Sequence, residues 1–486
     1  MNFTMPVFSV AVPEIFMLCM IAMILLVDVW LPAKHRMVTY FLVQATLVIT
    51  TCLLFSQFRN YPSPIITFSG NYVIDDLAII LKMFICVVSL FAFAYSRDYI
   101  NDRKMTIGEY YLLGMFAVLG MLIMASAYTF LTIYLGLELL SLSLYAMVAM
   151  QKDSADATEA AMKYFVMGAL ASGLLLYGIS MVYGATGSIQ VLQIASVLAN
   201  ASANQHVVVV LGLGFILAGL LFKFGAVPFH MWVPDVYQGA PTSMTLFIAS
   251  APKIAALGVT MRILVEALPS LQVQWEPILI VVALLSMFFG NLLAIAQTNI
   301  KRMLAYSSIA HIGYMLLGII AGPNSAEGYS AALFYIVTYV IVAAGGFAVV
   351  AILSQDGVEF DRLDDYRGLN ARNPWIAFMM LLLMFSMAGI PPTVGFFAKL
   401  GLLEALVEAH LVWLAALALL FAIVGAYYYL RIVMLMYFEE PAQQYQGSRI
   451  VVAPNMLVAI SINGVAVLLL GLLPSTLIDM CRISFA

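Results

Sequence analysis

Charged residues are scarce in this sequence. Asp, Glu, Lys and Arg make up 9% of its 486 residues, whereas an ordinary soluble domain carries roughly 25%. The formal net charge of −4 and the scattered basic residues leave no basic face to grip phosphate, so nucleic acid is excluded as a partner. Because 64% of the residues are hydrophobic instead, the composition predicts an all-α integral membrane protein.

Cysteine is scarce as well. The four cysteines (Cys19, Cys52, Cys86 and Cys481) stand far apart without a CxxC spacing, which argues against an iron–sulfur cluster, a zinc site or a disulfide framework. We expect them to be small buried hydrophobic residues. A GxGxxG fingerprint and a haem-type pair are also absent, so this chain is expected to bind no cofactor or metal itself.

Long apolar runs are abundant. A helix of about 20 mostly apolar residues crosses a membrane. Fourteen such spans are predicted, near 10–31, 38–58, 74–95, 109–126, 128–150, 160–182, 207–228, 241–267, 275–296, 303–321, 328–354, 374–410, 411–438 and 451–475. The first run contains Glu14 and Asp28 and lacks a basic leading region and a cleavage site. It predicts a retained helix rather than a signal peptide, in a mature chain that starts at or near Met1.

Lysine and arginine predict the orientation, because cytoplasmic loops are enriched in both. If the N-terminus lies outside, twelve of these residues fall in inner loops: Lys34, Arg36, Arg97, Arg103, Lys104, Lys152, Lys301, Arg302, Arg362, Arg367, Arg372 and Arg449. Two fall in outer loops, Arg59 and Arg482. Both termini are therefore predicted on the outer side, as an even number of spans requires.

Some ionisable residues lie inside the predicted spans. A charge at the bilayer centre costs about 2.5 to 3.5 kcal/mol, so such residues usually face a bundle interior or a water-filled path. Glu138, Lys223, Lys253 and Lys399 each lie well inside a span, and we interpret them as functional. Lys82 lies about a third of the way into its span and favours neither a functional nor a structural role.

Other polar residues in the spans leave alternatives open. Lys163 lies near the inner end of its span, where it either snorkels or approaches Glu138 through water. His311 is either a structurally satisfied histidine or a proton relay. Arg262 and Arg431 lie near span ends, which favours snorkelling for both.

Proline interrupts two spans beside a lysine. Pro228 and Pro234 follow Lys223, and Pro391–Pro392 precede Lys399. Proline inside a spanning helix frees backbone groups, which is tolerated only where protein or water satisfies them. Predicted helices 7 and 12 are therefore expected to be discontinuous, as helices around transporter ion sites often are, with a simple packing kink as the alternative.

Polar positions recur at a nearly constant spacing. The pairs are Glu138 and His311 (173 residues apart), Lys223 and Lys399 (176), and Lys253 and Arg431 (178). They predict two five-helix repeats, helices 4–8 and 9–13, and an odd number of spans inverts the second repeat relative to the first. The predicted divisions are a three-helix segment at 1–108, repeats at 109–267 and 268–438, and a C-terminal helix at 439–486. A polar path through such a bundle suggests proton movement more than transport of a large substrate.

Several motifs carry a resemblance to a known family. VPFHMWVPDVYQGAP preceded by Lys223, LGLELLSLSLYA around Glu138, and Lys253 after APTS resemble the antiporter-like subunits of respiratory complex I, which are related to multisubunit cation/proton antiporters. The resemblance covers nearly the full chain. LDDYRGLNARNPW at 363 and MAGIPPTVGFFAKL at 387 look most like the N-type subunits of the bacterial NADH:quinone oxidoreductase, because an M-type relative would carry a glutamate at Lys399 and an L-type relative a long lateral helix.

This resemblance implies a proton-translocating subunit of the bacterial inner membrane. It assigns six proton-transfer residues: Glu138 and Lys223 as the controlling pair, Lys163 as a modulator of Glu138, Lys253 and His311 as a relay with bound water, and Lys399 on the outlet side. Glu404, Glu408 and His410 are candidate exit groups, with a polar helix end as the alternative.

The resemblance also implies partners. These are the lipid bilayer, the other membrane subunits of complex I, including further antiporter-like subunits, and, indirectly, hydrophilic redox subunits that would hold NADH, FMN, iron–sulfur clusters and a quinone such as ubiquinone. Two rival interpretations remain open. One is a cation/proton antiporter complex without redox function, and the other is a passive scaffold in which neutralising Lys253 or Lys399 would harm assembly rather than transport.

Overall fold

Thirteen helices in the described parts of the chain are long and apolar enough to cross a membrane. The computed structural model describes residues 5–32, 35–61, 63–200, 202–355, 357–441 and 450–485. The shorter helices α16 (Pro374–Ala388) and α17 (Val394–Glu408) together supply a further crossing. The predicted all-α membrane fold with about fourteen spans is confirmed. Two residues of the orientation argument, Lys34 and Arg449, lie outside the described residues.

Three spans form the N-terminal part. A short antiparallel hairpin, which the sequence did not predict, joins the second span to the third and pairs Ile65 with Ile74. The elements are η1 (Phe8–Ala11), α1 (Val12–Trp30), α2 (Met37–Gln57), β1 (Ile65–Thr67), η3 (Phe68–Gly70), β2 (Tyr72–Ile74) and α3 (Asp76–Asp102).

Five further spans follow. A short helix, α7, lies between the third and fourth of them and is too short to cross. The elements are α4 (Ile107–Ser126), α5 (Phe130–Val148), α6 (Ala155–Thr186), α7 (Val191–Leu198), α8 (Ala203–Phe224), α9 (Trp232–Gly239), α10 (Thr242–Ile248), α11 (Ala251–Thr260) and η4 (Met261–Ala267).

The second group of five spans leads into the C-terminal part. Its elements are η5 (Pro269–Leu271), α12 (Gln272–Ile295), α13 (Ile300–Ala321), α14 (Gly328–Leu353), η6 (Leu363–Tyr366), α15 (Leu369–Arg372), α16, α17 and α18 (Val412–Phe438). The chain then continues through α19 (Pro454–Leu472) and α20 (Ser475–Ile483).

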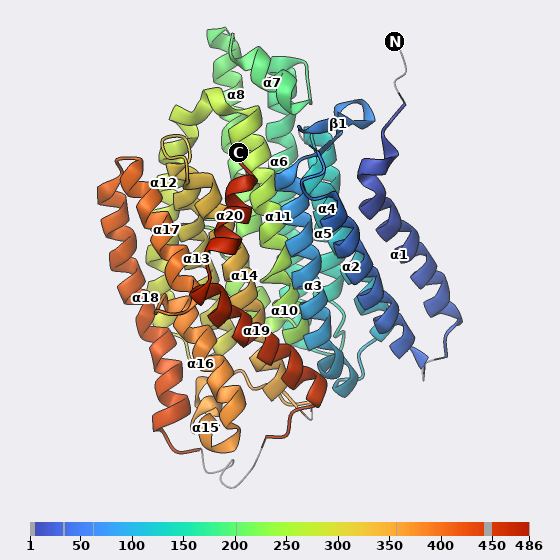
Figure 1. Cartoon of the computed structure of the whole chain (residues 1–486), viewed down its shortest axis with the longest axis vertical. Helices are drawn as coiled ribbons and strands as arrows, with labels where there is room; N and C mark the ends of the chain where they lie inside the picture. The colour runs from blue at the N-terminus through green and yellow to red at the C-terminus, as the bar shows by residue number, and fades with distance from the viewer. Residues whose placement is uncertain are drawn as a thin grey trace.

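Helices α13 and α14 form the centre of the bundle. Their most apolar 18-residue windows are 100% and 94% buried, against 33% for α2 and α18. Figure 1 shows α1 and α18 at opposite edges, with α13 and α14 between them. Polar side chains on α13 are therefore shielded from lipid on every side.

The predicted breaks in two spans are present, and a third break accompanies them. Helix α8 ends at Gly225 (φ +74°) and α16 at Gly389 (φ +85°), the left-handed conformation that glycine adopts most readily at a helix C-terminus. The eighth span is also interrupted, between α10 and α11 at Ser250. Lys253 therefore lies within one turn of a break, as Lys399 lies close to another.

Close glycine contacts give the two groups of five spans a common register. A Cβ atom on Gly120 would lie 2.7 Å from the nitrogen of Leu140, where α4 packs on α5. A Cβ atom on Gly290 would lie 2.6 Å from the nitrogen of Ala310, where α12 packs on α13. Gly120 and Gly290 are 170 positions apart, and so are Leu140 and Ala310. This supports the predicted repeats, but it aligns His311 with Ser141 rather than with Glu138.

The prediction for the cysteines is partly wrong. Cys86 and Cys481 are buried, whereas Cys19 and Cys52 are exposed on the outer helices α1 and α2. The surface of a membrane helix is itself apolar, so a small apolar side chain is stable there without burial inside the protein.

Candidate functional site

Lys223 contacts α5 one helical turn from Glu138. The Lys223 ammonium on α8 donates a 2.8 Å hydrogen bond to the hydroxyl of Ser141 on α5. Glu138 lies one turn before Ser141 on the same helix and accepts a hydrogen bond from Ser172 of α6. Both ionisable side chains are half-buried. The structure thus brings the predicted pair together, with serine hydroxyls between and beside the charges.

Lys163 has different partners from the one predicted. Its ammonium lies 2.7 Å from Asp235 and 2.8 Å from Glu159, at the end of α6 away from Glu138. Ser172, which does contact Glu138, lies nine residues further along α6, a rise of about 13 Å. The expected approach of Lys163 to Glu138 is therefore replaced by a bond to Asp235.

Lys253 lies deep in the bundle. It is 3% exposed, and its ammonium donates to the hydroxyl of Ser308 on α13 and lies 3.4 Å from the hydroxyl of Tyr339 on α14. The ammonium also lies 4.9 Å from the ring centre of Tyr339 and 6.0 Å from that of Tyr237. Lys253 is held by hydroxyls and aromatic faces, and no carboxylate of the described residues forms an ion pair with it.

His311 is surrounded by tyrosines. Hydrogen bonds of 2.7 and 3.0 Å join its Nδ1 to Tyr335 and its Nε2 to Tyr429. Its ring centre lies 4.8 Å from that of Tyr339, the tyrosine that also contacts Lys253. Both ring nitrogens therefore have partners that can donate or accept, which is what a relay requires.

The break between α16 and α17 holds Lys399. Its ammonium donates hydrogen bonds of 2.9 Å to the carbonyls of Met387 and Ala388, which the end of α16 leaves without helical partners. His311 and Lys399 line one cavity of about 20 Å³. The cavity is large enough for one water molecule, and the polar residues that line it include His311, Thr338, Ser386 and Lys399.

The pair formed by His311 and Lys399 has a counterpart in the first group of five spans. Ser141 occupies the position of His311 in the first group of spans, and Lys223 precedes a break as Lys399 follows one. Lys223 contacts Ser141, and Lys399 faces His311 across the cavity. The same arrangement of a lysine against the middle of a neighbouring helix therefore occurs twice.

Aromatic rings lie between Lys223 and Lys253. The Lys223 ammonium is 5.9 Å from the ring of Phe222, which is 5.5 Å from Trp232. Trp232 is 6.1 Å from Tyr237, whose ring contacts Lys253. Helix α9, which carries Trp232 and Tyr237, therefore contributes rings that lie between the two lysines.

The candidate exit residues lie at the far end of α17. Glu404 and Glu408 are exposed and line a cavity of about 330 Å³ together with Glu327 and Arg482. Glu408 accepts a 2.5 Å hydrogen bond from Ser325. His410 is exposed just beyond the helix. These carboxylates are reached from outside, at the end of the span towards which α17 leads from Lys399.

Two of the remaining charges in the spans belong to buried ion pairs. Lys82 is fully buried and pairs with Glu14. Arg262 is 2% exposed and pairs with Asp75 at 2.6 Å and Glu266 at 2.5 Å, so the expectation that it snorkels is wrong. Glu266 is one turn away on the same helix, whereas Asp75, the N-cap of α3, comes into reach only in the folded bundle.

We expect Arg262→Met to reduce the amount of assembled protein severely. The substitution leaves Asp75 and Glu266 without their cation, and breaking a buried pair from one side costs about 3 to 5 kcal/mol. Arg431→Met is the matched control, because within the described residues Arg431 bonds only backbone carbonyls, at 3.4 Å. Membrane content of the two variants checks the prediction, and equal amounts would contradict it.

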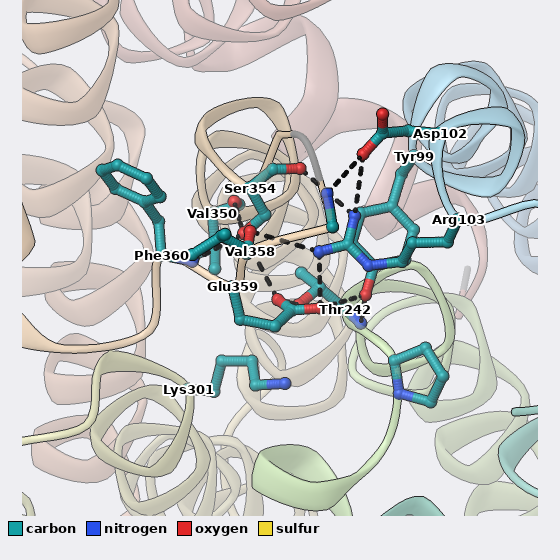
Figure 2. Close-up of polar contacts among 12 residues, drawn as sticks. Tyr99, Asp102, Arg103, Thr242, Lys301, Val350, Ser354, Val358, Glu359 and Phe360 are labelled. Atoms are coloured by element: carbon teal, nitrogen blue, oxygen red, sulfur yellow. Dashed lines mark hydrogen bonds and ion pairs between the residues drawn. The ribbon is translucent and has the colours of Figure 1, made fainter. Parts of the chain in front are cut away.

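The sequence analysis assigned no site role to three polar residues at the predicted inner end. Asp235 bonds Lys163 and also Arg302, at 2.9 Å. Glu359 accepts hydrogen bonds from Tyr99 and Thr242 and lies 3.0 Å from Arg103, as Figure 2 shows. The third residue is Lys301, 3% exposed, which was predicted to lie in an inner loop but belongs to the buried start of α13.

The charges around these carboxylates keep them ionised. Burial raises the pKa of Asp235, but hydrogen bonds from Lys163 and Arg302 outweigh burial and hold that pKa below its usual value. Burial likewise raises the pKa of Glu359, and the charges of Lys301 and Arg103 more than offset it. Because both values are depressed, the stabilisation that each carboxylate gives is complete at neutral pH and is lost only as the pH falls through the lowered pKa.

Comparison with known proteins decides the family. The NADH-quinone oxidoreductase subunit N of Thioalkalivibrio sulfidiphilus is 53% identical to this chain over 480 residues, which are 99% of this chain and 98% of the relative. The chain belongs to the NADH-quinone oxidoreductase subunit N family. The subunit N of Coxiella burnetii is 50% identical over 483 residues, 99% of each chain. The predicted family is confirmed.

Domain families and solved structures agree with membership of the subunit N family. Residues 127–425 match the family described as NADH:quinone oxidoreductase/Mrp antiporter, TM, and residues 2–98 match the NAD(P)H-quinone oxidoreductase subunit 2 N-terminal family. A chain of respiratory complex I from Thermus thermophilus is 32% identical with a TM-score of 0.80, over 97% of this chain and 98% of that one. A chain of the Mrp complex from Dietzia is 19% identical with a TM-score of 0.86, over 98% and 97%, and shows a common fold.

Proposed function

We propose that this subunit N family member moves protons across the membrane as a subunit of a proton-translocating NADH:quinone oxidoreductase. One observation carries the proposal for the site. Tyr339 contacts both Lys253 and His311 in the centre of the bundle, and His311 and Lys399 line one cavity. Titratable groups in such positions are costly in a membrane, and they usually mark an ion or proton path.

The contacts suggest a role for each residue. Glu138 biases the charge of Lys223 through the serine hydroxyls beside them. Lys253 and His311 pass the proton through Ser308 and the tyrosine hydroxyls, and Lys399 receives it through water in the cavity. Glu404 and Glu408 then release it into the cavity at the end of α17. Lys163 acts on this path through Asp235 rather than through direct contact with Glu138.

The orientation of the chain, its divisions and its cofactor-bearing partners are also part of the proposed function. Twelve basic residues against two favour both termini on the periplasmic side of a bacterial inner membrane. The predicted divisions at residues 108, 267 and 438 follow the repeats that the register at 170 residues supports. NADH, FMN, iron–sulfur clusters and the quinone belong to partner subunits in this proposal, and this chain supplies only proton transfer.

The proposal is tested on the complete complex in sealed vesicles. Adding NADH and a quinone should drive proton movement, and Lys223→Ala should lower the ratio of protons moved to NADH oxidised without lowering NADH oxidation in uncoupled membranes. Exposed Lys152→Ala is the control. A subunit of a pure antiporter complex would instead show proton exchange driven by a cation gradient without NADH. A passive scaffold would show unchanged pumping per assembled complex.

A further inference from the structure

The hairpin formed by α9 and α10 lies between Lys223 and Lys253 and contacts the surroundings of both. Trp232 of α9 donates a 3.0 Å hydrogen bond from Nε1 to the carbonyl of Phe222, the residue before Lys223. Tyr237, also on α9, lies against the Lys253 ammonium. Thr245 of α10 donates a 3.0 Å hydrogen bond to the Tyr237 carbonyl, which ties the two arms of the hairpin together. A shift of this hairpin would therefore change the surroundings of both lysines.

The tip of the hairpin is held by charged residues from outside it. Lys301, the second residue of α13, donates a 3.0 Å hydrogen bond to the carbonyl of Ala240 at the tip. Its neighbour Arg302 bonds Asp235 and, at 3.1 Å, Gln238 on α9. The start of α13 therefore binds both the tip of the hairpin and helix α9.

Glu359 binds α10, the second helix of the hairpin. It accepts a 2.8 Å hydrogen bond from the hydroxyl of Thr242, the first residue of α10, and a bond from Tyr99. The Tyr99 hydroxyl in turn accepts a 3.0 Å hydrogen bond from the Thr242 backbone nitrogen. Arg103 and Ser354 also contact the carboxylate, at 3.0 and 3.3 Å. Figure 2 shows Lys301 beside this cluster, so one compact group of polar contacts fixes the turn between α9 and α10.

The Glu359 loop and α13 form one unit. The backbone nitrogen of Ile300 donates to the carbonyl of Asp361 at 2.7 Å, and the Asn299 side chain donates to the Asp361 carboxylate at 2.6 Å. Helix α13 also carries Ser308 and His311, the partners of Lys253 and Lys399 in the candidate path. Movement at the start of α13 is thereby linked to the hairpin and to the relay.

We propose that Lys301 and Glu359 are positioning residues for proton transfer, which hold the α9–α10 hairpin and thereby the spacing between Lys223 and Lys253. The inference rests on the proposed function and adds residues that do not themselves carry the proton. A positioning lysine needs its charge and its donor but never has to lose its proton. Arginine, which stays protonated in proteins, should therefore substitute for Lys301 but not for a relay lysine.

The test compares four variants in the complete complex: Lys301→Met, Lys301→Arg, Lys253→Met and Lys253→Arg. The protons moved per NADH in Lys253→Met define the level without transfer through this chain. Lys301→Met should lose most of the pumping by which the parent complex exceeds that level. The rate of transfer through this chain should fall by up to roughly 10²-fold for a displacement of about 1 Å. Lys301→Arg should restore much of it, whereas Lys253→Arg should restore none. Hydrogen exchange of the assembled Lys301→Met complex should be faster over 232–248 than in the parent complex.

Two outcomes would overturn the inference while leaving the proposed function in place. One is full pumping per assembled complex in Lys301→Met alongside loss in Lys253→Met. The other is failure of Lys301→Arg to restore pumping in an assembled complex, which would make Lys301 a proton carrier. Normal pumping in Lys253→Met would overturn the proposed function itself.

A second variant keeps the inference testable if Lys301→Met does not assemble. Thr242→Val removes the hydroxyl that bonds Glu359 and changes no charge. It should lower proton movement in the same direction and by a smaller factor. Unchanged pumping together with unchanged exchange over 232–248 in Thr242→Val would contradict the inference.

Discussion

Lys253→Met is expected to stop proton transfer through this chain while NADH oxidation continues in uncoupled membranes. Methionine fills much of the same volume but carries no proton, and losing a positioned proton-transfer group lowers a rate by about 10² to 10⁴-fold. Assembly should survive, because Lys253 has hydroxyl and aromatic partners, and among the residues that the structure describes no carboxylate would be left unpaired by the substitution. The measurement is protons moved per NADH oxidised, in vesicles containing the complete complex.

Lys253→Arg serves as the control for charge at this position. Arginine keeps the positive charge and the hydrogen-bond donors but does not release its proton. We therefore expect it to block transfer as methionine does. Normal pumping in this variant would mean that Lys253 contributes only a fixed charge, and the relay would then need a different carrier.

Glu138→Gln is expected to produce the second large loss of pumping. The amide retains the shape of the side chain and can still accept from Ser172, but it removes the negative charge one turn from the Lys223 contact at Ser141. Without that charge the ammonium form of Lys223 loses its electrostatic support, and the pair can no longer alternate between holding and releasing a proton. The ratio of protons to NADH should fall, with assembly and NADH oxidation retained.

A second glutamate separates this effect from simple loss of a buried charge. Glu14 pairs with the fully buried Lys82, away from the proposed path. Glu14→Gln should therefore lower the amount of assembled complex, whereas Glu138→Gln should lower the protons moved by each complex. The interpretation of Glu138 would be wrong if both variants changed assembly alone.

The sequence predicted the fold well because its signals are local. Apolar runs of spanning length need no knowledge of neighbours, and glycine and proline next to Lys223 and Lys399 mark a helix end directly. The break at Ser250 had a weaker signal in Pro252, since proline at the start of a helix is also compatible with an ordinary N-terminus. The hairpin of β1 and β2 had no clear pattern in the sequence.

The partners of the ionisable residues were harder to predict, because they depend on which helices meet. Lys163 was expected near Glu138, but the fold of α9 brings Asp235 to it instead. Arg262 was expected to snorkel, yet Asp75 at the start of α3 comes within 2.6 Å. Glu359 lies in a polar loop where nothing in the local sequence distinguishes it from a solvated residue. Only the packing of α3, α10 and α13 around that loop gives it partners.

Proton transfer along the proposed path depends above all on a water-filled connection between His311 and Lys399. The most direct measurement is a structure of the assembled membrane arm at a resolution that shows ordered water. We expect a water molecule in the cavity of about 20 Å³, within hydrogen-bonding distance of the Lys399 ammonium and of the polar groups around His311. A cavity closed by apolar side chains or filled by a lipid chain, with Lys399 turned towards the bilayer, would contradict the proposed path.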